Sequence, residues 1–417
     1  MSRSPVASSP QLMRAINSRR VLAHAWGTEA FTASQAIGAT GLTRSTVIDV
    51  CEELVRKGWL AELGDARAVG DYRKGRPAKR YALRERAAVV VGVDAGYDRM
   101  SAVVADLRGG TLARTAIDIP AATPQSVERL ADADTRLRLA RRLVDEALPA
   151  AGVAPDEVLA ITVAVPAPVD DQGVSPYDVH GFWPVVNPGF LPVFAGSAPL
   201  VTVENDANLA AIAEGTCEEG SGRSADSYVA MLVGEGIGAG LMIDGRLVRG
   251  RRGGAGEMRF LDRIEGVGSP DGLARLARVW ATEAIRSGSL PPGSELALLD
   301  PGRLGEADVA AAAEAGDAAA IAIVDRLADR LARICLVLGD LLDVDVVVVG
   351  GAAAQTLPAV IGRAGELLAA SVDPTAPRLV PSRLGASAVA AGAVEHALER
   401  VREHALELDL PGVRAVA

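Results

Sequence analysis

The sequence predicts an α/β body preceded by a small, basic winged helix-turn-helix domain. Residues 1–86 carry 15 basic and 8 acidic side chains, whereas residues 87–417 carry 28 and 45. In the basic part, a helix, a glycine-containing turn and an amphipathic helix follow one another, which is the pattern of a helix-turn-helix. In the acidic part, apolar strands alternate with helical segments, and several strands end in glycine-rich turns, which favours an α/β fold.

The composition limits the class of protein. The chain has 417 residues, of which 49% are hydrophobic, so disorder is excluded as the main state. Its three cysteines, Cys51, Cys217 and Cys335, lie far apart, which fits neither a disulfide framework nor a paired-thiolate metal site. Arginines interrupt the first residues, so no signal peptide is expected, and no stretch approaches the roughly 20 apolar residues of a membrane span. We expect a cytoplasmic protein without a membrane partner.

The helices of the basic domain have recognisable ends. Residues 11–26 are expected to form the first helix. Thr32 and Gln35 form a capping box that begins a second helix, and Gly41 ends it. Thr43 is the expected N-cap of a third helix. Its apolar residues recur with the spacing of one helix face, at Val47, Val50, Cys51, Leu54 and Val55.

Two short strands, residues 58–63 and 80–83, enclose a cationic loop and complete the predicted wing. Such a wing would lie along phosphates or in a minor groove, while the start of the third helix would face the major groove. The candidate DNA-binding residues are Thr43, Arg44, Ser45 and Thr46 on the helix and Arg73, Lys74 and Arg76 in the wing. The alternative is a small helical protein-interaction module with a solvated basic loop.

The acidic body is predicted to repeat strand and helix. The expected strands are residues 89–93, 101–106, 111–119, 158–165, 200–204, 228–233, 238–244 and 344–349. The expected helical segments include residues 126–148, 207–215 and 310–342.

Glycine-rich turns follow three of these strands, at residues 94–96, 234–240 and 350–351. Glycine lets backbone N–H groups close on an anion or on another backbone segment. Asn205 and Asp206 stand where a buried strand meets a helix, a place where a carboxylate can be held against a sugar hydroxyl. The other interpretation of this pair is an N-cap for the following helix, and both roles can coexist.

Taken together, these motifs resemble the ROK family (repressors, open reading frames and sugar kinases), a branch of the actin-like ATPase superfamily. The resemblance covers residues 86–417 and rests on the three glycine turns, the Asn-Asp-Ala-Asn segment at 205–208 and the Gly-Ala-Gly-Glu segment at 254–257. The basic domain resembles the one of repressor members, whose wing contains Gly-Arg-Pro, as at residues 75–77.

The resemblance implies an actin-like (ribonuclease H-like) body of two duplicated lobes behind the winged helix-turn-helix domain. The DNA-binding domain would comprise residues 1–85. The first lobe would comprise residues 86–205 and be completed by a C-terminal helix at 386–417. Residues 206–385 would form the second lobe, with dimerisation and effector binding.

The phosphate-binding turns depart from the kinase pattern of this family. Asp206 matches the base that accepts the proton of the sugar hydroxyl in kinases. Tyr97, however, replaces a glycine of the first turn, while Asp98 and Glu235 replace threonines. A like charge at about 4 Å costs roughly 1 kcal/mol in water and about 4 at an effective dielectric of 20. Asp206 is therefore expected to be a vestigial base in a protein without catalysis and without a nucleotide cofactor.

The sugar side of the resemblance is better preserved. Glu257 is present, but Arg259 replaces a glycine and Phe260 replaces the histidine that ties zinc to the sugar in the family. Residues 261–274 contain no cysteine or histidine, so no metal site is expected. The candidate effector-binding residues are Asn205, Asp206 and Glu257. They would bind a different sugar or one with phosphate or acid drawn by Arg259, or they form an internal network without a ligand.

The resulting hypothesis is a sequence-specific transcriptional regulator, a repressor, of carbohydrate metabolism genes. It would act as a homodimer or a dimer of dimers on a near-palindromic operator and respond to a small sugar or sugar phosphate. One alternative is an ATP-dependent sugar kinase with a DNA-binding extension. Another is a DNA-binding protein whose body serves only for dimerisation.

Overall fold

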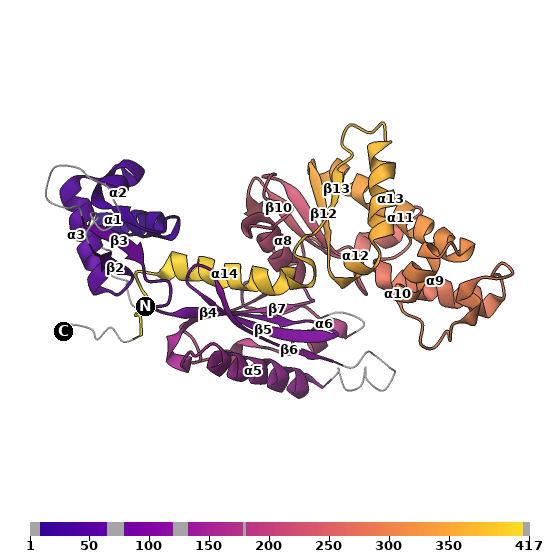
Figure 1. Cartoon of the computed structure of the whole chain (residues 1–417), viewed down its shortest axis with the longest axis horizontal. Helices are drawn as coiled ribbons and strands as arrows, with labels where there is room; N and C mark the ends of the chain where they lie inside the picture. The colour runs from indigo at the N-terminus through magenta and orange to yellow at the C-terminus, as the bar shows by residue number, and fades with distance from the viewer. Residues whose placement is uncertain (1–8, 65–78, 120–131, 178–180, 412–417) are drawn as a thin grey trace.

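The computed structural model describes residues 9–64, 79–119, 132–177 and 181–411. A helical head lies at one end of the molecule, followed by two lobes that each contain a five-stranded sheet (Figure 1). The C-terminal helix α14 runs from the junction of the lobes towards the head. No helix in these ranges is long and apolar enough to cross a membrane.

The head has the helices and strands that the sequence predicts. They are α1 (Ser9–Trp26), α2 (Ala33–Thr40), α3 (Arg44–Arg56), β1 (Phe31–Thr32), β2 (Leu60–Leu63) and β3 (Arg80–Leu83). The Thr32–Gln35 capping box begins α2, and Gly41 ends it with a φ of 70°, a value that favours glycine. The Thr43 hydroxyl caps α3 by accepting a bond from the Thr46 amide. Strand β3 lies between β1 and β2.

The first lobe is built on a sheet in the order β6-β5-β4-β7-β8. Its strands are β4 (Val89–Ala95), β5 (Arg99–Asp106), β6 (Thr111–Asp118), β7 (Val158–Val165) and β8 (Leu200–Asn205). The pairs β4–β5 and β5–β6 are antiparallel, whereas β4–β7 and β7–β8 are parallel. Helices α5 (Ala133–Ala150) and α14 (Ala388–His404) cover opposite faces (Figure 1).

The second lobe repeats this topology, with strands in the order β11-β10-β9-β12-β13. They are β9 (Tyr228–Leu232), β10 (Gly238–Ile243), β11 (Arg246–Leu247), β12 (Val346–Gly350) and β13 (Arg378–Pro381). Again the first three strands pair antiparallel and the last two join in parallel. The same order and the same directions in both sheets are the signature of a duplicated fold.

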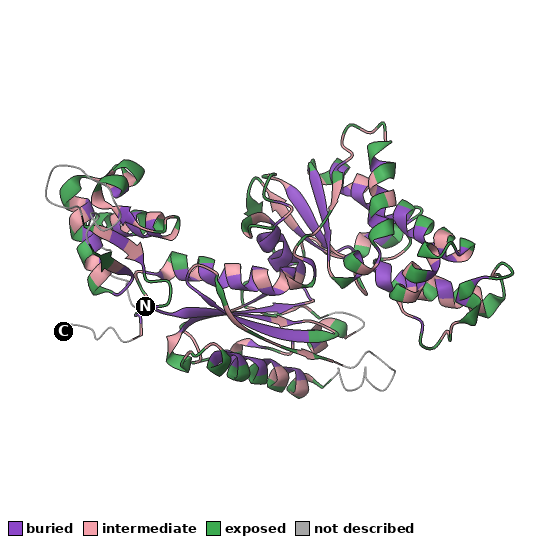
Figure 2. Ribbon diagram, in the orientation of Figure 1, coloured by how far each residue is buried: buried purple, intermediate pink, exposed green. Residues whose placement is uncertain are grey.

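Further helices complete the body. In the first lobe they are α6 (Phe182–Val186) and α7 (Leu191–Phe194). Beyond them lie α8 (Asp206–Thr216), α9 (Leu273–Ser287), α10 (Glu306–Glu314), α11 (Ala318–Leu342), α12 (Ala352–Thr356) and α13 (Pro358–Ala369). Short 3-10 turns occur at Pro155–Glu157, Arg259–Arg263, Glu295–Leu298 and Gly385–Ser387. Figure 2 shows that the sheets and α8 are the most completely buried parts.

The prediction of a single helix over residues 310–342 is wrong, because this stretch contains the end of α10 and all of α11. Gly316 adopts a φ of 92°, which an α-helix cannot continue through. Asp317 then begins α11, since its carboxylate accepts bonds from the amides of Ala319 and Ala320. The predicted helix at 126–148 is observed as α5, and residues 120–131 lie outside the described ranges.

Helices α8 and α14 join the two lobes. Helix α8 packs on β9 and β10 of the second sheet, while α14 packs on β4 and β7 of the first, and the two helices pack on each other. Gly392 of α14 meets the backbone of α8 so closely that a Cβ atom there would lie 1.8 Å from the carbonyl oxygen of Leu209. Only glycine allows this approach, so the lobes meet at a helix crossing made of small residues.

Candidate functional site

The start of α3 is an exposed polar surface of the head. Arg44 and Ser45 are exposed, and Arg44 forms no ion pair with any residue in the described ranges. The Thr43 hydroxyl lies 3.1 Å from the Ser45 hydroxyl and 2.9 Å from that of Thr46. These positions leave the guanidinium of Arg44 available to an external partner. The predicted wing residues Arg73, Lys74 and Arg76 lie outside the described residues.

Asn205 holds the turn between β8 and α8. Its Oδ1 accepts a 3.0 Å bond from the Asn208 amide, and its Nδ2 donates a 3.1 Å bond to the Ala167 carbonyl. The residue is 8% exposed. The capping role that the sequence suggested for the Asn205–Asp206 pair therefore belongs to Asn205, which fixes the position of its neighbour Asp206.

Asp206 lies near two other carboxyl groups, Asp94 of the first lobe and Glu257 of the second. The region around these three groups, where the lobes meet, is called the cleft below. The Oδ1 atom of Asp206 accepts a 2.7 Å bond from the Ala207 amide at the start of α8. Burial, followed by the charges of Asp94 and Glu257, raises its pKa to about 7, against the opposing effect of that bond. Burial also raises the pKa of Glu257, which Arg259 opposes. The predicted residues thus come together, with Asn205 at the end of β8 in the first lobe and Asp206 and Glu257 in the second lobe.

Asp94 and Arg136 form a part of the cleft that sequence reasoning missed. Burial raises the pKa of Asp94 to about 7, although the Gly96 amide and Arg136 oppose the shift. Arg136 is 1% exposed and donates to the carbonyl oxygens of Ala95 at 2.6 Å and Gly96 at 3.1 Å. Arg136 therefore holds the backbone of the first glycine turn in place. A signal existed in the sequence, since Arg136 continues the apolar stripe of α5, whose other buried members are Ala140, Leu143, Val144, Ala147 and Leu148.

An arginine pairs with the acidic residue of the second glycine turn. Arg278 of α9 donates to both carboxylate oxygens of Glu235, at 2.5 and 2.7 Å, and to Glu306 at 3.2 Å. Burial and the charge of Glu235 raise the pKa of Asp98 in the first lobe. Arg278 thus compensates part of the negative charge of these three acids. Asp98 and Glu235 would therefore repel a phosphate group less than two uncompensated carboxylates would.

Arg259 lies against an aromatic side chain of the opposite lobe. Its guanidinium carbon is 4.0 Å from the ring centroid of Trp183, and such cation–π contacts are worth about 0.5–2 kcal/mol. The ring of Phe182 stands 5.8 Å from that of Tyr97 in the first glycine turn. This wall of the cleft is therefore aromatic and joins the two lobes.

No group of three or more His, Cys, Asp or Glu side chains within the described ranges is arranged to hold a metal ion. The cleft instead contains carboxyl groups with raised pKa values, two glycine turns and a cation–π contact between the lobes. Such a surface suits a ligand with several hydroxyl groups.

Sequence comparison finds relatives of two kinds. A xylose repressor from Caldicellulosiruptor bescii is 24% identical over 255 residues, which make up 59% of this chain and 58% of that protein. A glucokinase from Halalkalibacterium halodurans is 33% identical over 168 residues, or 36% of this chain and 48% of that protein. The chain thus spans about half the length of the relatives it matches.

Solved structures show the same fold. A ROK family transcriptional regulator, a homolog of E. coli Mlc, covers 94% of this chain and 99% of its own, with a TM-score of 0.69 and 23% identity. A ROK glucokinase from Streptomyces griseus, in complex with glucose and AMPPNP, covers 75% of this chain and 100% of its own, with a TM-score of 0.60 and 21% identity. The predicted two-lobe actin-like body behind a helix-turn-helix head is confirmed. The sequence profile of the ROK family matches residues 90–400, and the chain belongs to the ROK family.

Proposed function

We propose that this protein is a sequence-specific transcriptional regulator, a repressor, that binds operator DNA through its head and a small sugar in its cleft. The observation that carries the proposal is the head itself, whose exposed Arg44 begins a helix of helix-turn-helix geometry. Arginine at the start of such a helix can contact guanine edges or phosphates. We further propose that it acts in the cytoplasm on carbohydrate metabolism genes.

A regulator requires that the head respond to the cleft, and the head is fixed firmly to the first lobe. The Trp26 indole donates a 2.9 Å bond to the Leu107 carbonyl. Arg108 donates to the carbonyl oxygens of Ala25, Trp26 and Thr28, at 3.3, 2.9 and 2.7 Å. An arginine of the body thus caps the C-terminus of the first head helix. Movement of the first lobe would therefore carry the head with it.

The sugar is proposed to bind to Asp206 and Glu257, with Asn205 holding Asp206 in place. Asp206 and Glu257 both belong to the second lobe, but the charge of Asp94 in the first lobe acts on Asp206. A ligand that touches Asp206 beside Asp94 would therefore favour one separation of the lobes over another. A ligand shifts such an equilibrium only by its difference in affinity for the two arrangements. We also propose the domain division at residues 85 and 205, with the C-terminal helix completing the first lobe. The two separate sheets and the packing of α14 on the first sheet support it.

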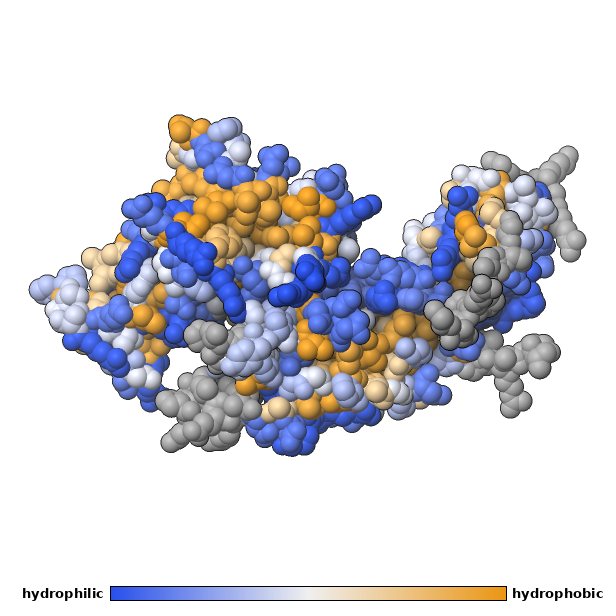
Figure 3. Space-filling view, turned by 180° about the vertical axis from the view of Figure 1, so that it is seen from behind, coloured by the Kyte–Doolittle hydropathy of each residue, from blue (hydrophilic) through white to orange (hydrophobic). Residues whose placement is uncertain are grey.

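Two-fold assembly is proposed through the second lobe. Its surface displays a broad hydrophobic area when seen from behind (Figure 3). The exposed large apolar side chains of this lobe include Leu341, Leu367 and Val372. A dimer, or a dimer of dimers, would place two heads on a near-palindromic operator.

The test is DNA binding by the full chain. Fluorescence anisotropy with a duplex from upstream of its own gene should show binding that weakens steeply with salt, because phosphate contacts release counter-ions. Arg44→Ala should lower the preference for this duplex over random DNA by about 5- to 100-fold, the worth of one base contact. The control Arg20→Ala removes an exposed charge of α1 and should leave the preference unchanged. Equal losses on every sequence in both variants would contradict base recognition by Arg44.

A second candidate function, an ATP-dependent sugar kinase, is favoured by one observation. Asp206 has a pKa of about 7, a suitable value for a general base near neutral pH. A coupled assay for ADP release tests this function. Sugar-dependent turnover that Asp206→Asn abolishes would establish kinase activity and favour this second function over the first.

A further inference from the structure

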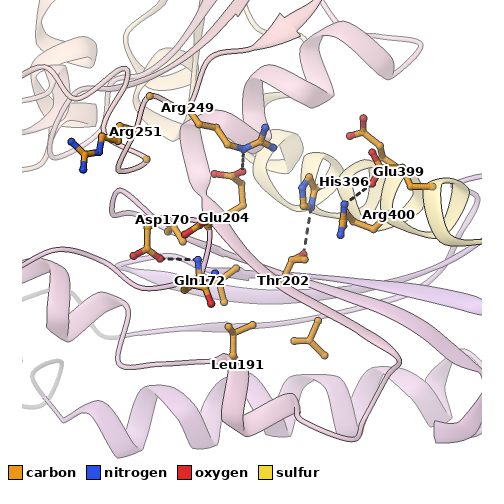
Figure 4. Close-up of a pocket in the computed structure, with 18 residues that line it drawn as sticks. Asp170, Gln172, Leu191, Thr202, Glu204, Arg249, Arg251, His396, Glu399 and Arg400 are labelled. Carbon is orange, nitrogen blue, oxygen red and sulfur yellow. Dashed lines mark hydrogen bonds and ion pairs between the residues drawn. The ribbon is translucent and has the colours of Figure 1, made fainter. Parts of the chain in front are cut away.

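A cavity beside β8 has walls from both lobes and from α14 (Figure 4). Its volume is about 580 Å³, within the usual range of small-molecule sites. It is lined by residues 169–173, 191 and 201–204 of the first lobe, residues 249–251 and 253 of the second lobe, and the C-terminal half of α14. None of the three predicted effector residues is among its lining residues, so it is a separate site.

An ion pair between a buried glutamate and an exposed arginine lines this cavity. Glu204 is 5% exposed, and its Oε2 accepts a 2.5 Å bond from Nε of Arg249. Its Oε1 accepts bonds of 2.9 Å from the Asn205 amide and from Nδ2 of Asn208. Side chains alternate along a strand, so Glu204 and Asn205 face different sides of β8. The pair links the lobes and leaves the terminal nitrogens of Arg249 towards the cavity (Figure 4).

His396 gives the cavity a polar atom without a protein partner. The residue is 7% exposed, and its Nδ1 lies 3.2 Å from the Thr162 hydroxyl and 3.5 Å from that of Thr202. Its Nε2 has no hydrogen-bond partner among the described residues and is not enclosed by protein. Burial lowers the pKa of this imidazole to about 4, so the ring is neutral at pH 7 and can exchange a hydrogen bond with a hydroxyl group.

The charges around the cavity disfavour an anionic ligand. The acids Asp170, Asp171, Glu204, Glu399 and Glu403 outnumber the arginines Arg249, Arg251 and Arg400. Two of these arginines are already engaged, Arg249 with Glu204 and Arg400 with Glu403. A phosphate group would meet a net negative lining, whereas neutral hydroxyl groups find both donors and acceptors.

We propose that this cavity is a second ligand site, distinct from the Asp206 cleft, which binds a small, hydroxyl-rich and unphosphorylated molecule such as a neutral sugar. The ligand would contact Nε2 of His396, the free nitrogens of Arg249 and the carboxylates of residues 170–171. Because its walls come from both lobes and α14, occupancy fixes the lobes relative to each other. The inference does not depend on the proposed regulatory function.

Histidine resonances provide the test, because the chain contains only 4 histidines. Full-length protein labelled with ¹⁵N-histidine is titrated with glucose, xylose and sucrose, and His396→Phe assigns the signal. The imidazole nitrogens of His396 should shift with at least one of these sugars, while those of His24 in the head stay unchanged. Glucose 6-phosphate should need an about fivefold higher concentration than glucose, the effect of one like-charge contact in water.

Variants separate the two sites. The shift of His396 should persist in Asp206→Asn, which alters only the cleft. It should vanish in Gln172→Trp, which fills the mouth of the cavity from an exposed position, but not in Gln11→Trp, a matched change on α1. Three results would overturn the proposal: unchanged His396 signals with every sugar at tens of millimolar, loss of the shift in Asp206→Asn, or tighter binding of glucose 6-phosphate than of glucose.

Discussion

The first lobe makes two contacts that differ in kind. Towards the head it shares one apolar cluster, which contains Trp59 and Leu22 of the head together with Leu398, Val401 and other residues of α14. Towards the second lobe it meets α8 at Gly392, and cavities of about 580 and 540 Å³ lie on either side of Arg249. The first contact joins apolar side chains of one cluster, some of them aromatic, and is reinforced by the hydrogen bonds of Trp26 and Arg108. The second combines small residues with polar hollows.

This difference indicates where the molecule can move. Separating the head from the first lobe would expose apolar side chains of the shared cluster to water and break the hydrogen bonds of Arg108. The head and the first lobe should therefore move as one body. The crossing of α8 and α14 is closely packed, but the polar hollows beside it leave room for the lobes to shift about it. We infer that ligands act on the junction of the lobes, and that the head follows the first lobe.

The largest expected effect concerns the ligand in the junction. Asp206→Asn should weaken sugar binding about 10- to 100-fold, since a hydrogen bond to a charged group contributes about 1.5–3 kcal/mol. Glu235→Gln, on the arginine-paired side of the cleft, should change the affinity less than about threefold. Calorimetric titration with glucose and xylose measures both. Equal losses in the two variants would show that the two sides of the cleft contribute alike.

The second prediction concerns the packing of α8 on α14. Gly392→Ala places a methyl group 1.8 Å from the Leu209 carbonyl oxygen, so the stability of the body should fall by about 1–3 kcal/mol. Gly365→Ala in α13 is the matched control, because its methyl group meets no atom within 4 Å and should be neutral or stabilising. Thermal unfolding compares them. A Gly392→Ala variant as stable as the wild type would mean that the crossing is not closely packed.

The contact between head and first lobe is tested at Arg108. Arg108→Ala removes the cap of α1 and the contact with Glu85 at 3.3 Å, without touching the DNA-binding surface. The effect of sugar on DNA affinity should therefore fall by about 3- to 10-fold, while DNA affinity without sugar changes little. Arg114→Ala, an exposed change on β6, serves as the control. An undiminished sugar effect in Arg108→Ala would show that the head is coupled by another route.

The last prediction is a dependence of stability on pH. Burial raises the pKa of Asp206 from 3.8 to about 7, so the folded protein keeps a proton that the unfolded chain has released. The stability contributed by this group is therefore present below pH 4 and is lost as the pH rises to 7. Asp206→Asn should raise the melting temperature relative to the wild type more at pH 8 than at pH 5. The same difference at both pH values would contradict a raised pKa.

The head and most strands of the body were predictable because their signals are local. A capping box at Thr32, a left-handed Gly41 and a cap at Thr43 each act within a few residues. Alternating apolar strands similarly show their type in short windows. The error at Gly316 has a local cause too, since alanine-rich sequence on both sides continues the helical pattern.

The contacts that carry the functional proposals were not predictable, because they join distant parts of the chain. His396 meets Thr162 and Thr202 across 234 and 194 residues. Arg108 caps a helix that ended 82 residues earlier. The pairing of Glu235 with Arg278 likewise depends on how α9 returns to the second glycine turn. No periodicity or motif marks such pairs within one sequence.

The central claim is that binding of a sugar between the lobes changes the affinity of the head for DNA. The most direct test is the affinity of the full chain for a duplex from upstream of its own gene, with and without saturating glucose or xylose. We predict an affinity that falls with salt and that one of these sugars changes by about tenfold in the wild type but not in Asp206→Asn. Failure to bind this duplex at low salt, or an affinity that no sugar alters, would contradict the account.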